Sequence, residues 1–294
     1  MYIIVGANGY LGAYFIKKIR ELTNDSIIAT ARDIRNLSDD ERVKWVELDV
    51  TQKESVNKLN VFMKKDACNK VIYLAAYHHP DLVEKNPKIA WNVNITSLAY
   101  FLNYVENVDS LFYPSTDSVY GEGTIEKKFK ETDKTKPVNR YGRQKVIAEN
   151  LVVEYGYNVV RFPFLVAPSL VRCKKHFYDF ILQDIKDGKK VEMFVDSIRS
   201  SLDFGTAAEL VVKLAEKKSD KIPKILNVSG DQALSKYDVG LMIAEKNHID
   251  TNLIIPISVK NANEIFRVPR ANITLLDNSN IKKVLEIDTI KISI

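Results

Sequence analysis

The fold of this chain is decided at its start, by the stretch Tyr2-Ile3-Ile4-Val5-Gly6-Ala7-Asn8-Gly9-Tyr10-Leu11-Gly12. The four apolar residues predict a short buried strand, and three evenly spaced glycines follow it. Apolar residues then recur at helical spacing over residues 10–22. In such a strand–turn–helix unit the glycines let a pyrophosphate approach the backbone, and the helix N-terminus offers it free N–H groups. The stretch therefore predicts a dinucleotide site.

Strands and helices alternate outward from this stretch. Further strands are expected over residues 26–31, 43–48, 70–76, 110–115 and 157–162, and longer helices over 87–105 and 138–154. Thr51, with Glu54 as its capping-box partner, is expected to begin another helix. Strands separated by helices form right-handed βαβ units and a parallel sheet. The sequence thus predicts an α/β protein with a Rossmann-type doubly wound parallel sheet.

The second half of the chain is less regular. Helices are expected over residues 177–186, 207–217 and 236–246, and short strands over 191–194 and 225–228. We expect a dinucleotide-binding Rossmann domain over residues 1–165. Residues 166–294 are expected to form mainly a smaller α/β substrate-binding lobe, with some segments returning to the Rossmann domain.

Composition argues against several classes of function. The net charge of +5 is mild and the basic residues are interleaved with acids, so nucleic-acid binding is not expected. No apolar run is long enough to predict a membrane span, and no signal peptide is recognisable. Cys68 and Cys173 are isolated, and no Cys or His cluster has ligand spacing. We therefore expect reduced thiols, no metal site and a cytoplasmic protein.

The end of the second expected strand bears on the choice of cofactor. NAD-specific folds place an acid there to hold the ribose 2′-hydroxyl, whereas this chain reads Thr30-Ala31-Arg32-Asp33. An arginine in this place can pair with a 2′-phosphate, so Arg32 favours NADPH over NADH. The alternative is that Arg32 is solvated and Asp33 takes the acid's place, which would give NAD. Asp49-Val50, after the third strand, is positioned to contact the adenine.

Tyr141 and Lys145 lie four residues apart in the expected helix 138–154, so their side chains share one face. The ordinary pKa of tyrosine, near 10, is too high for a general base at neutral pH, and a nearby ammonium would lower it. Lys145 can also hydrogen-bond a nicotinamide ribose. Thr116, at the end of the fifth strand, can donate a hydrogen bond to a substrate oxygen. These residues predict an enzyme that moves a proton and a hydride at a carbinol carbon.

The chain resembles the extended short-chain dehydrogenase/reductases, a group of nucleotide-sugar epimerases, dehydratases and reductases. The resemblance covers nearly the whole chain and rests on Gly6-x-x-Gly9-x-x-Gly12, Asp49-Val50, Leu74-Ala75-Ala76, Asn92-Val93-Asn94, Ser115-Thr116-Asp117, Val119-Tyr120-Gly121 and Tyr141-x-x-x-Lys145. It implies that Thr116, Tyr141 and Lys145 are catalytic and that Asn92 holds the active-site helix. Arg161-Phe162-Pro163 would lead into the loop under the nicotinamide.

The motifs and the resemblance together give one set of expected cofactor-binding residues. They are Gly6, Asn8, Gly9, Tyr10, Leu11, Gly12, Arg32, Asp49, Val50, Leu74, Ala75, Ala76, Tyr141, Lys145 and Phe162. The expected substrate-binding residues are His78, Asp117, Ser118, Arg199 and Arg270. Arg199 occupies the place of a phosphate-binding arginine in related enzymes, and Arg172 and Lys174 are further candidates for contacts with the substrate diphosphate.

The resemblance also bears on the reaction. Dehydratases of this group carry a glutamate as base where this chain has Ser118, which cannot take that role. Leu226-Asn227-Val228-Ser229-Gly230 and the segment from Arg267 to Asp277 are similar to dTDP-4-dehydrorhamnose reductases, although Ser118 replaces their aromatic residue. The expected activity is therefore NAD(P)H-dependent reduction of a nucleotide-linked 4-keto-6-deoxy sugar, with Tyr141 as proton donor and Thr116 and Lys145 assisting.

Two alternatives stay open. A nucleotide-sugar 4-epimerase with bound NAD would need a second acid or base, and His78, after the fourth strand, is a candidate. A dinucleotide-binding regulatory subunit is a more distant alternative, because the regulatory subunit of methionine adenosyltransferase resembles these reductases. His176 and His248 are given no role. The resemblance also implies a possible homodimer that pairs through the helices around Asn92 and Tyr141.

Overall fold

A computed structural model of the protein describes residues 1–172, 174–218, 221–261 and 267–294. Its centre is a seven-stranded parallel sheet with the strand order β10-β7-β5-β4-β1-β2-β3. The strands are β1 (Tyr2–Val5), β2 (Ile27–Ala31), β3 (Val43–Glu47), β4 (Lys70–Tyr73), β5 (Ser110–Thr116), β7 (Asn158–Phe162) and β10 (Ile225–Asn227). The predicted α/β fold with a doubly wound parallel sheet is confirmed.

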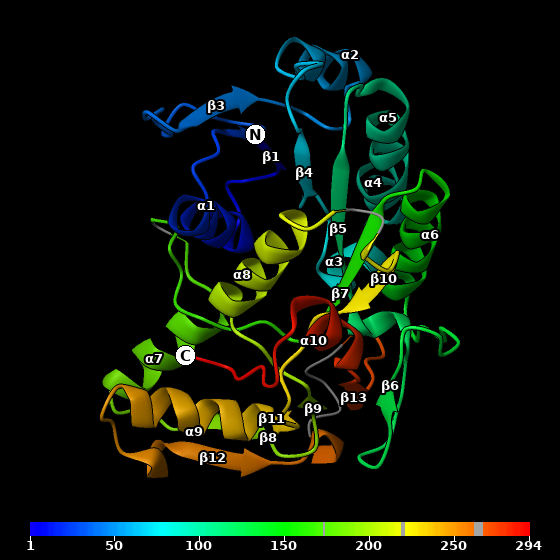
Figure 1. Ribbon diagram of the computed structural model, residues 1–294. Coiled ribbons are helices and arrows are strands. Elements are labelled where there is room, and N and C mark those ends of the chain that lie inside the picture. Colours follow the sequence, from blue (N-terminus) through cyan, green and yellow to red (C-terminus); the bar gives the residue numbers. More distant parts are fainter. Residues whose placement is uncertain (173, 219–220, 262–266) are drawn as a thin grey trace.

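Helices cover both faces of this sheet (Figure 1). One face packs against α1 (Tyr10–Leu22), α8 (Phe204–Ala215) and α10 (Ser279–Leu285), and the other against α2 (Lys53–Asn57), α5 (Ser97–Tyr104) and α6 (Arg140–Glu154). Within β1 the side chains alternate, because Tyr2 and Ile4 join the first core and Ile3 and Val5 the second. Burial on both faces explains why this strand is apolar throughout.

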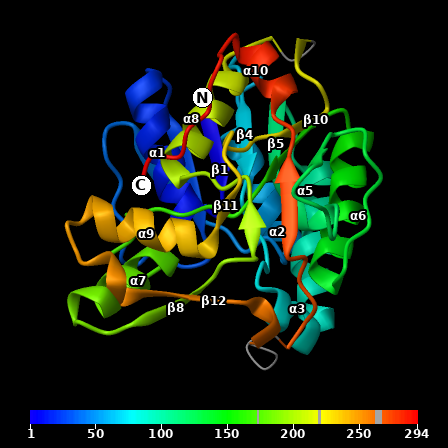
Figure 2. The same ribbon diagram turned by 90° about the horizontal axis from the view of Figure 1, so that it is seen from below.

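The second half of the chain builds a smaller layer beside the carboxyl ends of the strands. Figure 2 shows its parts from below. The parallel pair β8 (Val191–Phe194) and β12 (Ile254–Ile257) packs with α7 (Phe177–Lys186) and α9 (Lys236–Lys246). A four-stranded sheet joins β11 (Leu234–Ser235), β9 (Ile198–Arg199), β13 (Ile273–Leu276) and β6 (Lys128–Phe129). The domain boundary near residue 165 stays a prediction.

The remaining helices lie next to the site. After β4 come α3 (Pro80–Lys85) and α4 (Pro87–Trp91), and a π-helical turn (Asn92–Thr96) joins α4 to α5. The helix expected over residues 87–105 therefore forms, but with one wider turn inside it. A 3₁₀ turn (Asp117–Val119) follows β5 directly.

Local details differ from expectation at Thr51 and at the end of the fourth strand, among other element ends. Thr51 does not cap a helix, because α2 begins at Lys53 and the Thr51 hydroxyl donates instead to Asp49 Oδ1 at 2.7 Å. The fourth strand ends at Tyr73, three residues before its expected end. Cys68 is an exposed free thiol, whereas Cys173 lies outside the described residues. In the described parts of the chain, no helix has the length and apolarity to cross a membrane.

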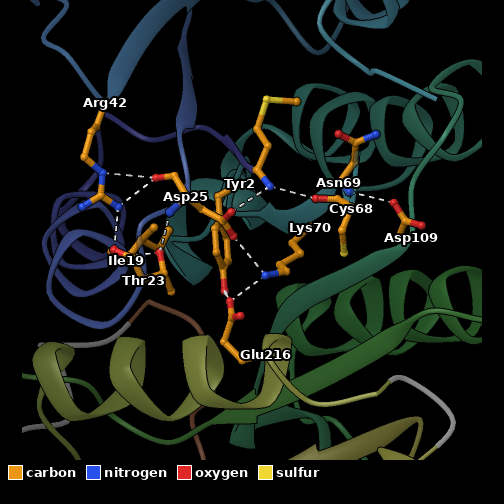
Figure 3. A network of polar contacts seen from close by, with 11 residues as sticks. Tyr2, Ile19, Thr23, Asp25, Arg42, Cys68, Asn69, Lys70, Asp109 and Glu216 are labelled. Atoms are coloured by element: carbon orange, nitrogen blue, oxygen red, sulfur yellow. Dashed lines mark hydrogen bonds and ion pairs between the residues drawn. The ribbon is translucent and has the colours of Figure 1, made fainter. Parts of the chain in front are cut away.

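A polar network joins the amino-terminal ends of the central strands to the end of α8 (Figure 3). The Tyr2 hydroxyl donates to Glu216 at 2.5 Å, and the Lys70 ammonium lies 2.7 Å from Glu216 and 3.0 Å from Asp25. Lys70 is 8% exposed, so its charge requires these carboxylates. The network thus fixes β1 and β4 against α8 at the amino-terminal ends of the strands, opposite the site.

Candidate active site

The glycine-rich turn between β1 and α1 has a backbone that a ligand can approach closely. Gly6 has a φ of +85°, which favours glycine, and its N–H donates to Thr30 Oγ1 at 3.1 Å. At Gly12 a Cβ atom would lie 2.2 Å from the Ala7 carbonyl oxygen, so only glycine lets α1 pack this closely. Gly9 precedes α1 and no side chain caps the helix. The first N–H groups of α1 are thus available to an anion.

A cavity of about 550 Å³ opens above this turn. All fifteen residues expected to bind the cofactor line it: Gly6, Asn8, Gly9, Tyr10, Leu11, Gly12, Arg32, Asp49, Val50, Leu74, Ala75, Ala76, Tyr141, Lys145 and Phe162. They come from the turn after β1 and the start of α1, from the loops after β2, β3 and β4, from β7 and from α6. This is the edge of a doubly wound sheet where ligands bind.

Arg32 lines this cavity and its side chain is exposed. The neighbouring Asp33 is engaged elsewhere, because Arg35 binds its two carboxylate oxygens at 2.9 and 2.5 Å. This guanidinium lowers the pKa of Asp33 to about 2. The acid that could replace Arg32 as a ribose contact is therefore already paired with a cation.

Residues 174–176 lie against the glycine-rich turn, and sequence analysis missed their place. Lys174, a candidate for the substrate diphosphate, instead lines the dinucleotide cavity and donates to the Asn8 carbonyl at 2.9 Å. His176, which was given no role, lies in the same cavity with its ring 4.8 Å from that of Tyr10. Burial lowers the pKa of His176 to about 4, so it is neutral at pH 7. Neither residue belongs to a sequence motif.

The three expected catalytic residues converge at the end of β5. Thr116 is its last residue, and its hydroxyl accepts a hydrogen bond from Ser118 N at 3.2 Å. Tyr141 and Lys145 lie on α6, whose first turn is capped by Asn139 through Gly142 N at 2.9 Å. The Lys145 ammonium donates to Tyr113 Oη at 2.9 Å and to the Pro114 carbonyl at 2.8 Å. Strand β5 therefore positions both Thr116 and the lysine.

The pKa values of this group differ from the expectation. Burial raises the pKa of Tyr141, the charge of Asp117 raises it further, and a hydrogen bond with Thr116 opposes both. Burial also lowers the pKa of Lys145 to about 7. The expected lowering of the Tyr141 pKa by a full positive charge on Lys145 is thus not found in the protein without cofactor. A tyrosine that keeps its proton is suited to donate it.

Asn94, and not Asn92, holds the active-site helix. The Asn94 side-chain amide donates to Gln144 Oε1 on α6 at 2.8 Å, and its carbonyl accepts from Tyr77 N at 2.7 Å. The Asn92 side chain is exposed. The prediction for Asn92 is wrong because the π-helical turn places the side chain of Asn94, two residues later, against α6.

A second cavity, of about 730 Å³, lies beside the first on the side of the smaller layer. The five expected substrate residues all line it: His78, Asp117, Ser118, Arg199 and Arg270. Five residues line both cavities, namely His78, Thr116, Tyr141, Pro163 and Leu165. A substrate in the second cavity would therefore meet a cofactor in the first at the Tyr141 hydroxyl.

Two of the three arginines that line this cavity, Arg199 and Arg270, are engaged with the protein, and the third is the exposed Arg267. Arg199 Nε lies 3.0 Å from Asp117 Oδ2, and its other nitrogens donate to the backbone carbonyls of Ile198, Ala271 and Asn272. Arg270 binds Asp81 at 2.7 Å. Burial raises the pKa of Asp117, and the Arg199 charge opposes this shift. The Arg199 side chain therefore fixes Asp117 and the residues just before β13, with few donors left for a phosphate.

A buried ion pair supports the site from behind. Glu149 on α6 and Arg161 on β7 are 2% and 3% exposed, and they form two contacts of 3.0 and 2.6 Å. Ser115, next to Thr116, donates to Glu149 Oε1 at 2.5 Å. The pair thus joins the catalytic helix to the two strands beside it. Among the described residues, no group of three or more His, Cys, Asp or Glu could hold a metal ion.

The chain is similar to proteins of one sequence family and to several solved structures. The sequence model of the RmlD substrate binding domain family matches residues 1–291. A dTDP-4-dehydrorhamnose reductase from Bacillus anthracis, solved in complex with NADP, superposes with a TM-score of 0.80 over 99% of this chain and 94% of that chain, at 20% identity. A UDP-glucuronic acid 4-epimerase from Bacillus cereus, in complex with UDP-glucuronic acid and NAD, gives a TM-score of 0.79 over 98% and 94%, at 18% identity.

Curated sequence relatives include one reductase of similar length. A probable low-salt glycan biosynthesis reductase of Haloferax volcanii is 25% identical over 283 residues, which are 95% of this chain and 90% of that protein. The beta subunit of methionine adenosyltransferase 2 from Bos taurus is 23% identical over 87% of this chain and 75% of that protein. The resemblance found in the sequence is confirmed.

Proposed function

We propose, from the premise that this chain belongs to the RmlD substrate binding domain family, that it reduces a keto group on a nucleotide-linked sugar with a nicotinamide dinucleotide. The observation that carries the proposal is the meeting of two cavities at Thr116 and Tyr141. One cavity has the glycine turn and uncapped helix that suit a dinucleotide. The other is large enough for a sugar nucleotide.

In this mechanism the protein positions a carbonyl group and supplies a proton. A bound reduced dinucleotide would provide the hydride to the carbonyl carbon. Tyr141 gives its hydroxyl proton to the carbonyl oxygen as negative charge develops there, and Thr116 donates a hydrogen bond to the same oxygen. Lys145 orients the ribose of the cofactor and stabilises the tyrosinate that remains. The product is an alcohol, which at C4 of a 4-keto-6-deoxy sugar gives the 6-deoxy sugar.

The direct test is oxidation of NADPH, followed at 340 nm, with dTDP-, UDP-, GDP- and CDP-linked 4-keto-6-deoxy sugars. Consumption with one of them, together with a product reduced at C4, supports the proposal and identifies the nucleotide. Absence of consumption across the panel, with dinucleotide bound, contradicts the 4-keto reductase.

The proposed cofactor is NADPH. Arg32 is the cation at the adenine end of the cavity, and Asp33, the acid that would favour NAD, is paired with Arg35. Lys174 lies over the glycine-rich turn instead, near the place that a pyrophosphate would take. The two cations should therefore act on different phosphates.

Substitution of each cation should give a different result. Arg32→Ala should weaken NADPH binding by about 10- to 100-fold and leave NADH binding within about twofold, because only NADPH has a 2′-phosphate. Lys174→Ala should weaken both by a similar factor of about 3 to 10. Fluorescence titration of each cofactor measures the four dissociation constants. An unchanged NADPH-to-NADH ratio in Arg32→Ala would exclude the role of Arg32.

A 4-epimerase is the second candidate, and the position of His78 favours it. His78 lines both cavities together with Tyr141, so a second acid or base is available at the reacting centre. An epimerase would retain NAD through purification and would turn over a nucleotide sugar without added NADPH. The stereochemistry at C4, measured by NMR, separates the two reactions.

We also propose a homodimer. Exposed apolar side chains lie on α4 and α6, the helices expected to pair: Ile89, Trp91 and Ile147 are 55%, 47% and 38% exposed. Burial of such side chains between two copies would be favourable. The molar mass in solution, measured by light scattering, tests this assembly.

A further inference from the structure

Lys236, which no sequence motif singles out, lies in the wall of the substrate cavity. It is the first residue of α9, whose N-cap is Ser235. Its side chain lines the cavity together with Thr116, Asp117 and Tyr141. A lysine in this position brings a positive charge to the place where the substrate would be bound.

The surroundings of the Lys236 amine are aromatic and cationic. The amine stands over the ring of Phe164 and lies 5.2 Å from the ring centre of Phe177. No ion pair joins it to a carboxylate within the part of the chain that the structure describes. Burial lowers its pKa well below the ordinary value, and the positive charges of Arg199 and Arg270 act in the same direction.

The nearest acid does not compensate for this charge. Asp117 favours the charged amine, but its carboxylate is already bound by Arg199 at 3.0 Å. Arg270 is likewise bound to Asp81. The cavity thus holds two arginines with acidic partners, the exposed Arg267, and Lys236, which forms no ion pair among the described residues. Aromatic faces stabilise a cation only in part, and a desolvated cation gains most from an anion beside it.

We propose that the Lys236 ammonium binds an anionic oxygen of the nucleotide-linked sugar. This inference rests on the proposed function and assigns a specificity residue to its substrate cavity. Two parts of such a substrate carry anionic oxygens, namely the diphosphate and, in a uronic acid, the sugar carboxylate. Arg199, the phosphate-binding residue expected from the sequence, is engaged with three backbone carbonyls and Asp117. We assign this role to Lys236, whose amine lies in the cavity wall without an ion pair among the described residues.

The test is isothermal titration calorimetry of the full chain with its bound oxidised dinucleotide. The ligands are UDP-glucose, dTDP-glucose and UDP-glucuronic acid. Lys236→Met keeps the length of the side chain and removes its charge. Lys246→Met, at the exposed end of the same helix, is the matched control. Lys236→Arg keeps the charge and should retain most of the affinity. Thermal unfolding and dinucleotide affinity show whether the variants are folded.

Lys236→Met should weaken binding by about 10- to 100-fold, whereas Lys246→Met should leave it within about twofold. A loss with all three ligands assigns the diphosphate, and a loss with UDP-glucuronic acid alone assigns a sugar carboxylate. Unchanged affinity in folded Lys236→Met for every ligand that wild type binds overturns the inference and leaves the proposed function standing. If wild type binds none of the three, the inference is overturned for UDP- and dTDP-linked sugars, and the proposed function is decided separately by the reduction panel with GDP- and CDP-linked sugars.

Discussion

Tyr141→Phe should lower kcat by about 10²- to 10⁴-fold, the usual contribution of a positioned general acid. The substitution removes one hydroxyl from the place where the two cavities meet and keeps the ring that packs there. Because burial raises the Tyr141 pKa, the wild-type hydroxyl is protonated at pH 7 and no other described hydroxyl except that of Thr116 is placed equivalently. Dinucleotide affinity should stay within about twofold of wild type.

The measurement of kcat is steady-state oxidation of NADPH at saturating concentrations of the substrate that the panel identifies. Tyr155→Phe provides the control, because Tyr155 follows the same helix and its hydroxyl contacts Asn103 on the surface. That variant should keep the wild-type kcat. A wild-type kcat in Tyr141→Phe would remove this residue from the mechanism, and a loss in both variants would indicate a general effect on α6.

Glu149→Ala is expected to destabilise the protein by about 3–5 kcal/mol, the usual cost of leaving one partner of a buried ion pair. Arg161 would remain at 3% exposure without a carboxylate, and the Ser115 hydroxyl would lose its acceptor. The midpoint of thermal unfolding should fall by roughly 10 °C. Part of the activity should also be lost at temperatures below this midpoint, where the variant is folded, because the pair joins α6 to β5 and β7.

Replacing both partners of the ion pair separates the effect of the buried charge on stability from the effect of packing. In Glu149→Leu with Arg161→Met no buried charge remains, so much of the free energy of unfolding should return. Asp184→Ala, which breaks an exposed pair with Lys189, should change the free energy of unfolding by less than about 1 kcal/mol. Denaturant unfolding of the four proteins measures these differences. Equal destabilisation in the single and double variants would contradict the argument from uncompensated charge.

The fold could be predicted because its signals are local. The helix over residues 10–22 and the buried strands can be recognised from the pattern of apolar residues in short, continuous segments. Because βαβ units are right-handed, these elements allow few topologies. The cofactor cavity follows the same logic. Its expected lining residues sit in turns directly after strands, and parallel strands bring their carboxyl ends to one edge.

The features that sequence analysis missed depend on contacts between distant residues. Asn94 contacts α6 in place of Asn92 because of a π-helical turn, which has no clear sequence signal. Arg199 is engaged by the carbonyls of Ala271 and Asn272, some seventy residues later in the chain. Lys174 and Lys236 are single residues among 43 lysines and arginines, so residue type alone could not distinguish them.

The strand order has a consequence for the synthesis of this protein. Strand β7 (Asn158–Phe162) is buried throughout and pairs on one side with β10 (Ile225–Asn227), which the ribosome makes only after α7, β8, β9 and α8. Until then β7 is an unpaired apolar edge on a nascent chain, and such edges attract other strands. Glu216, the partner of Tyr2 and Lys70, also emerges late. The sheet therefore cannot be completed until the second half of the chain has been synthesised. Chaperones that cover exposed sheet edges should raise the yield of folded protein.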